Sequence, residues 1–130
     1  MREVARVLRP GGSFIFSSHN LDVVGPAGFL PSLFRIELSR HPVRCAKAVA
    51  RAGLQLVNYL RNARRQYRRA DHAILIDPAH GFTMSHYYVT PAAQQRQLVE
   101  AGFLPDVDIE PDVREGTPYS LYYAACRVGA

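Results

Sequence analysis

The first eighteen residues, MREVARVLRPGGSFIFSS, constrain the fold more than any other stretch of the chain. Valine and leucine recur every three or four positions over the first nine residues, which predicts a short helix. Pro10 cannot continue that helix, and the two glycines after it allow the chain to reverse. Ser13–Ser18 is then a short apolar run, typical of a strand buried in a parallel sheet. Because a helix, a glycine turn and a buried strand form half of an α/β unit, we predict an α/β fold.

A second group of signals lies in the C-terminal part of the chain. Thr90–Pro91 predicts the start of a helix, since a threonine oxygen can cap the first turn and proline fits there, and Gly102 ends that helix. Asp106–Glu110 alternates acidic and apolar residues, as on a strand near the edge of a sheet. Gly116–Pro118 turns the chain into a last apolar strand, Ser120–Val128. We therefore predict that an antiparallel hairpin closes the sheet.

A strongly basic segment separates these two parts. Residues 40–70 hold nine basic residues and no acidic one, whereas the rest of the chain holds seven basic residues against all 11 acidic ones. The periodicity predicts a helix from His41 to about Arg69, within an insertion of about residues 26–70. Its apolar positions form a stripe flanked by arginines, and they are Val43, Ala46, Ala50, Leu54, Val57 and Leu60.

The composition is that of one ordinary globular domain. The 130 residues are 48% hydrophobic and 21% charged, which excludes wholesale disorder. No apolar run approaches the roughly 18 residues that span a bilayer, and we expect no signal peptide. Two distant cysteines, Cys45 and Cys126, exclude a disulfide scaffold and a cysteine-based metal site. We expect a soluble, cytoplasmic domain without a transmembrane segment.

Five segments follow one another in an informative order. They are Glu3–Gly12 (EVARVLRPGG), the strand Ser13–Ser18, Tyr88–Pro91 (YVTP), Leu98–Phe103 (LVEAGF) and the strand Leu121–Val128. This order resembles the C-terminal half of a class I S-adenosylmethionine-dependent methyltransferase, over about 60 of the 130 residues. In that family a helix ending RVLKPGG precedes the fifth strand, a later helix ends in an AGF-like turn, and an antiparallel hairpin of the sixth and seventh strands closes the sheet. The resemblance implies the C-terminal half of a Rossmann-like sheet with a helical insertion and a closing antiparallel hairpin.

The resemblance also implies methyl transfer from S-adenosylmethionine to a small-molecule or lipid-like acceptor. In the family, a glycine-rich loop after the first strand approaches the cofactor and an acidic residue after the second strand holds its ribose. The chain supplies neither feature, because its Gly-Gly pair precedes a strand and Gly25 and Gly28 lie among prolines. We therefore expect a partial domain, inactive alone, that lacks the N-terminal cofactor-binding half. We expect it to pair with that half, or with itself through an exposed sheet edge.

The first candidate site residues lie at the end of the predicted strand Ser13–Ser18. In an open parallel sheet, ligands bind beyond the carboxyl ends of the strands. His19 lies at such an end and is the predicted catalytic residue, as an acceptor of the proton that leaves a nucleophile. Asn20 beside it is a predicted substrate-binding residue. The alternative is that both residues only cap and turn the chain.

Three further candidates lie just before the helix start at Thr90. His86, Tyr87 and Tyr88 are predicted to bind the substrate, since two aromatic rings supply contact area and polar tips. The alternative is that one tyrosine packs under the helix while His86 is exposed. His80 and His86 are separated by a glycine, and no histidine or carboxylate set shows metal-ligand spacing. We expect no metal site.

The basic helix supports a second hypothesis, of a different class. A non-catalytic binding module would use this helix for an anionic partner, which is nucleic acid, lipid or an acidic protein. Proteins that bind single-stranded nucleic acid interleave aromatic residues with basic ones, so that the bases can stack. In this segment Tyr59 and Tyr67 alone are too few aromatic residues for such stacking, so we expect no nucleic-acid partner. Two interpretations remain: the basic helix holds an acidic substrate, or it is a solvated lid helix without a ligand.

Overall fold

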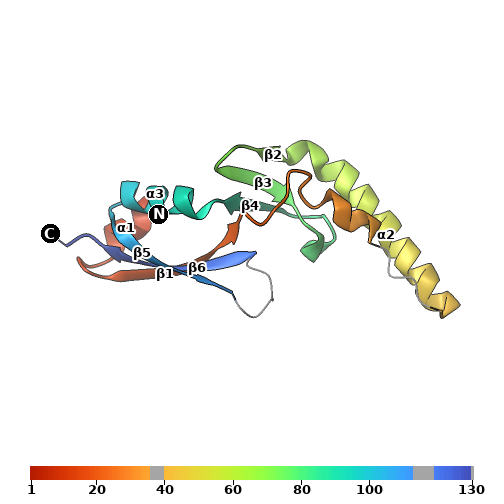
Figure 1. The fold of residues 1–130 in the computed structure, drawn as a ribbon, viewed down its shortest axis with the longest axis horizontal. Helices are drawn as coiled ribbons and strands as arrows, with labels where there is room; N and C mark the ends of the chain where they lie inside the picture. The colour runs from red at the N-terminus through yellow and green to blue at the C-terminus, as the bar shows by residue number, and fades with distance from the viewer. Residues whose placement is uncertain (36–39, 113–118, 130) are drawn as a thin grey trace. The chain divides into compact units, whose positions relative to one another are not determined.

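The fold of residues 1–35, 40–112 and 119–129 is described by a computed structural model (Figure 1). It is an α/β fold with a mixed sheet. In chain order, the elements are α1 (Arg2–Val7), β1 (Ser13–Asn20), η1 (Leu30–Phe34), α2 (Pro42–Asn62), η2 (Ala63–Arg65), β2 (Tyr67–Arg68), β3 (His72–Ile76), η3 (Pro78–His80), β4 (Ser85–Val89), α3 (Pro91–Glu100), β5 (Phe103–Pro111) and β6 (Ser120–Arg127). The six strands form one sheet in the order β2-β3-β4-β1-β6-β5.

The chain divides into two compact units. The first unit comprises Met1–Val23, Ala70–His72 and Tyr88–Ala130, and the second comprises Val24–Arg69 and Ala73–Tyr87. The first unit therefore contains both ends of the sequence pattern that resembles a methyltransferase, and the second contains the basic insertion.

The predicted helix, glycine turn and strand at the start of the first unit are confirmed. Gly11 has a φ of +73°, which favours glycine. The Gly12 amide donates to the Arg9 carbonyl at 2.8 Å, and a Cβ on Gly12 would lie 2.8 Å from that same oxygen. A side chain at position 12 would displace the backbone of the turn. The glycine pair is therefore explained by the local geometry of the turn.

The closing hairpin is also confirmed. β5 and β6 pair antiparallel, from Phe103↔Arg127 to Pro111↔Leu121, with a register shift between Phe103 and Val107. β6 also pairs antiparallel with β1, from Ser13↔Cys126 to His19↔Ser120. The predicted turn Gly116–Pro118 lies outside the described residues. Because β1 pairs parallel with β4 on its other side, the sheet is mixed.

The core of the first unit lies on one face of its strands. Its buried cluster combines α1, α3, β5 and β6, through Ala5, Leu98, Phe103, Leu121, Tyr123 and Ala125. Phe14 and Phe16 of β1 stack on each other, with ring centroids 4.7 Å apart, and pack against this cluster. Ile15, on the other face of β1, is 70% exposed. The expectation that the apolar run Ser13–Ser18 is buried is therefore wrong for Ile15, because α1 and α3 cover the same face of β1.

Tyr123 carries a polar group into this core, and this leads to a stability prediction. Its hydroxyl is buried and makes no hydrogen bond within the described part of the chain. Burial, and secondarily the negative charge of Asp22, raises the pKa of Tyr123 from 10.0 to about 12. We expect Tyr123→Phe to raise the free energy of unfolding by about 1 kcal/mol at neutral pH, since an unpaired buried hydroxyl is removed.

The same substitution should change the response to alkali. Because the folded pKa of Tyr123 lies above its unfolded value, the fold favours the neutral phenol, and this contribution is lost as the pH rises from 10 through 12. Urea unfolding at several pH values should show that the difference in stability between Tyr123→Phe and the wild type widens over this window. Equal pH profiles would contradict the assignment, and Tyr119→Phe, a partly exposed tyrosine, is the matched control.

In the second unit, the basic helix is shorter than predicted. α2 ends at Asn62 instead of about Arg69, and Tyr67–Arg68 forms a strand that pairs antiparallel with β3. The Arg68 guanidinium donates to the carbonyls of Val24 and Gly25, at 2.8 and 2.6 Å. These tertiary hydrogen bonds and the strand pairing replace further helical turns. The insertion is therefore helical only in part.

The side of α2 that packs on its own unit is largely polar. Tyr59 meets the ring of Phe82 edge-on, with centroids 5.7 Å apart, and joins a small core of Leu33, Ile76 and Phe82. Asn58 and Asn62 donate side-chain hydrogen bonds to the carbonyls of Gly81 and Phe82, at 3.0 and 3.1 Å. No residue of α2 is fully buried. The predicted apolar stripe exists, but it faces solvent.

Candidate functional site

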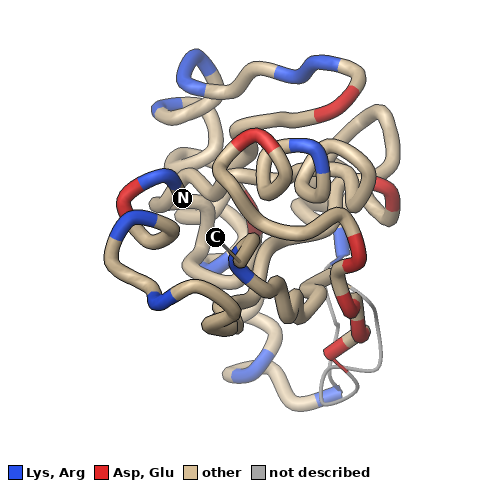
Figure 2. The backbone as a smooth tube through the Cα atoms, turned by 90° about the vertical axis from the view of Figure 1, so that its left-hand side faces the viewer, with Lys and Arg blue, Asp and Glu red and all other residues tan. Residues whose placement is uncertain are grey.

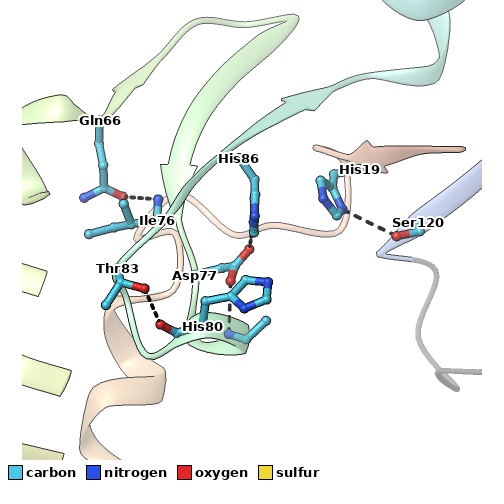
Figure 3. A network of polar contacts seen from close by, with 9 residues as sticks. His19, Gln66, Ile76, Asp77, His80, Thr83, His86 and Ser120 are labelled. Atoms are coloured by element: carbon cyan, nitrogen blue, oxygen red, sulfur yellow. Dashed lines mark hydrogen bonds and ion pairs between the residues drawn. The ribbon is translucent and has the colours of Figure 1, made fainter. Parts of the chain in front are cut away.

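His19 lies inside β1, because the strand is two residues longer than predicted. Its ring stacks on that of Tyr88, with centroids 5.0 Å apart and planes at 27°. Its Nδ1 lies 3.4 Å from the Ser120 hydroxyl (Figure 3). In the tautomer that donates from Nδ1 to Ser120, Nε2 carries the lone pair, which is the state a general base requires. β1, β4 and β6 together orient this imidazole.

The pairing of β1 with β4 supports the predicted position of the site. The two strands are parallel, with His19 opposite Tyr88 and Asn20 opposite Val89. Both strands therefore end at the same edge of the sheet, where ligands bind in open α/β folds. The structure brings His19 and Tyr88 together, and their roles in catalysis and substrate binding stay predictions.

Asn20 has contacts that belong to a turn. It is 7% exposed, and its Oδ1 accepts a hydrogen bond from the Asp22 amide at 3.0 Å. The backbone amide of Asn20 donates to the Tyr119 carbonyl at 2.7 Å. These contacts match the alternative in which Asn20 shapes the exit from β1. Substrate binding by Asn20 stays a prediction.

The three candidates on β4 are divided by the alternation of a strand. His86 and Tyr88 point to one face and Tyr87 to the other. Tyr88 is buried, whereas Tyr87 is 41% exposed. Tyr88 belongs to the first unit, and His86 and Tyr87 belong to the second. The three residues therefore do not form one cluster within a single unit.

His86 is held by a buried carboxylate that the sequence analysis missed. Asp77 is 5% exposed, and its Oδ2 is hydrogen-bonded to Nδ1 of His86 (Figure 3). The other carboxylate oxygen accepts from the Ala79 amide at 3.0 Å and caps η3. The His80 ring lies edge-on to His86, with centroids 5.6 Å apart. In the sequence, Asp77-Pro78 reads as a strand breaker, and no spacing rule connects it to His86.

A carboxylate that holds one nitrogen of an imidazole is a recurring acid–base arrangement. The carboxylate fixes the tautomer and the direction of the ring, so that the other nitrogen, Nε2, can exchange a proton with a ligand. The Asp77–His86 pair is therefore a second candidate for proton transfer. Within residues 1–35, 40–112 and 119–129, no group of three or more His, Cys, Asp or Glu side chains could hold a metal ion.

The glycine-rich loop and the acidic strand end that the resemblance implies for S-adenosylmethionine are not supplied by this sequence. The glycines after β1 include Gly25 and Gly28, and a Cβ on either would meet no atom within 4 Å. Neither glycine is therefore required by contact with a neighbouring atom of the chain. The Gly11–Gly12 pair belongs to the turn before β1.

The polar flank of α2 borders an open groove of about 540 Å³ in the second unit. Its basic residues come from α2 and from the segment after η1 and are coloured blue in Figure 2; they are Arg35, Arg44, Lys47 and Arg51. Among the described residues, no carboxylate forms an ion pair with any of the four. The groove is compatible with an acidic ligand, one of the interpretations of the basic segment.

No protein-family model, curated protein or solved structure matches this chain. Within its described part, no helix is both long and apolar enough to span a membrane.

Proposed function

We propose that the chain is the C-terminal, substrate-side part of an S-adenosylmethionine-dependent methyltransferase that acts on a small-molecule or lipid-like acceptor. The observation that carries the proposal is the arrangement of the first unit. A helix and glycine turn lead into β1, and the antiparallel hairpin of β5 and β6 closes the sheet against β1. The resemblance implies the same elements in the same order.

In this proposal, His19 handles the proton of the acceptor. A hydroxyl or amine that gains a methyl group must lose its proton, and an imidazole at the carboxyl end of β1 is placed to accept it. The stacked Tyr88 ring limits the rotation of His19, and Ser120 directs its Nδ1. The chain thereby contributes the position of the acceptor and the destination of its proton.

The Asp77–His86 pair is the competing assignment for the same role. Asp77 orients His86 more firmly than Ser120 orients His19, because the carboxylate bond is charge-assisted. His19 has the advantage of lying at the carboxyl end of two parallel strands. Substitution of each histidine separates the two assignments, as described in the Discussion.

The methyl donor would be held by residues outside these 130, in the complete enzyme. A calorimetric titration of the 130-residue chain with S-adenosylmethionine should therefore show no saturable heat. Saturable binding would contradict the assignment of the cofactor to other residues, and it would leave the transferase proposal to be judged by activity.

The transferase itself is tested on the protein as the cell makes it. We expect transfer of a tritiated methyl group from S-adenosylmethionine to a component of a small-molecule or lipid extract from the source cells. The absence of a labelled product from both extracts would contradict the proposal. Label recovered only in protein or nucleic acid would contradict the acceptor class.

A further inference from the structure

The helix labelled α2 in Figure 1 carries exposed apolar side chains along its length. Leu54 and Leu60 are 62% and 64% exposed, and further apolar side chains on this helix are also exposed. The exposed apolar face comprises Val43, Val49, Leu54, Leu56, Val57 and Leu60. A helix that packs on its own domain normally buries such a face. α2 instead packs through Tyr59, Asn58 and Asn62, so among the described residues of its own unit nothing covers this face.

The charged residues of α2 are all basic. The helix carries Arg44, Lys47, Arg51 and Arg61 and no acidic residue. Five more arginines lie within seven residues of its ends, at positions 40, 64, 65, 68 and 69. An exposed apolar face next to cations without any carboxylate is the combination that lies flat on anionic membranes.

We propose that α2 binds the surface of an anionic lipid bilayer, with its exposed apolar face in the boundary between headgroups and acyl chains. The apolar side chains leave water, and the arginines and Lys47 stay at the level of the lipid phosphates, since long basic side chains can extend toward them. This proposal is independent of methyl transfer. It concerns the surface on which the chain resides.

Two other occupants of this face fit less well. A second copy of α2 would bring two sets of cations together without an acidic residue on either helix, and like charges at close range repel. Nucleic acid would engage the cations through its phosphates but would leave the valines and leucines in water. A bilayer with anionic headgroups satisfies both the apolar and the cationic side chains.

The test is co-sedimentation of the 130-residue chain with vesicles. We expect saturable binding to vesicles of phosphatidylcholine with roughly one third phosphatidylglycerol, and weak binding to phosphatidylcholine alone, since the anionic surface potential attracts basic segments. The triple variant Leu54→Ser/Val57→Ser/Leu60→Ser should bind the anionic vesicles at least about 100-fold more weakly, because three apolar side chains no longer enter the bilayer.

The substituted side chains are exposed, so the variant should fold, and circular dichroism checks this. The matched control is Val7→Ser/Ile15→Ser, at 68% and 70% exposure in the first unit, which should bind like the wild type. Unchanged binding by the triple variant would overturn the proposal, since it would show attraction through charge alone. Absence of vesicle binding, or preferential binding of an oligonucleotide, would also overturn it. So would a dimer of the free chain that the triple substitution dissociates.

Discussion

Replacement of His19 by glutamine is expected to lower kcat for methyl transfer by a factor of about 10² to 10⁴, the usual contribution of a positioned general base. Glutamine can hydrogen-bond to Ser120 but cannot accept the proton of the acceptor at neutral pH. KM should change little, because the Tyr88 ring and the end of β1 remain in place. Initial rates with a tritiated methyl donor, measured on the protein as the cell makes it, give both parameters.

Two further variants make this result interpretable. His72→Gln makes the same chemical change at a residue paired with exposed Asp71 and without an assigned role, and it should leave kcat unchanged. If His86→Gln lowers kcat while His19→Gln does not, the base is His86, oriented by Asp77. Full activity in both the His19 and the His86 variants would exclude general-base catalysis by this chain.

Phe103→Ala is expected to lower the free energy of unfolding by about 3–5 kcal/mol, as for other fully buried phenylalanines. Phe103 is 1% exposed, and its ring lies 5.9 Å from that of Phe14. It is the first residue of β5 and belongs to the same buried cluster as Leu98 of α3. A whole domain is typically stable by about 5–15 kcal/mol, so this loss would leave the first unit close to unfolding.

Urea unfolding followed by far-ultraviolet circular dichroism measures this loss, since the chain has no tryptophan. Phe34→Ala removes the same ring at a position that is 74% exposed, and it should change stability by less than about 0.5 kcal/mol. Equal effects of the two substitutions would contradict the packing described for Phe103. Because the chain has two compact units, the first unit of the Phe103 variant should unfold at a lower urea concentration than the second unit.

The elements that the sequence predicted well are those with local causes. Pro10 stops α1 because it lacks an amide hydrogen, and Gly12 is required by the adjacent Arg9 carbonyl. Thr90 caps α3 by accepting a hydrogen bond from the Ala93 amide at 3.3 Å. The alternating residues of β5 and the apolar run of β6 formed the expected hairpin. The turn and the caps depend on residues within a few positions of one another, and the two hairpin strands are neighbours in the sequence.

The elements that the sequence did not predict depend on residues far apart. The Arg68 side chain donates hydrogen bonds to carbonyls 43 and 44 positions away, in an extended segment. α2 therefore ends at Asn62, before the predicted end at about Arg69. Asp77 reads as a turn residue until β4 brings His86 to it. A burial prediction for Ile15 from its apolar run failed, because both helices of that unit cover one face of β1.

By itself, the sequence determined that the chain is α/β, that a glycine turn follows α1, where α3 begins, and that α2 is amphipathic, since caps, glycine turns and periodicity act over a few residues. Only the tertiary structure decided which histidine meets which carboxylate, and that α2 turns its apolar face to solvent. Periodicity defines a face of a helix but not its partner. The partner is chosen by contacts between distant segments, here those of Tyr59, Asn58 and Asn62 with Gly81 and Phe82.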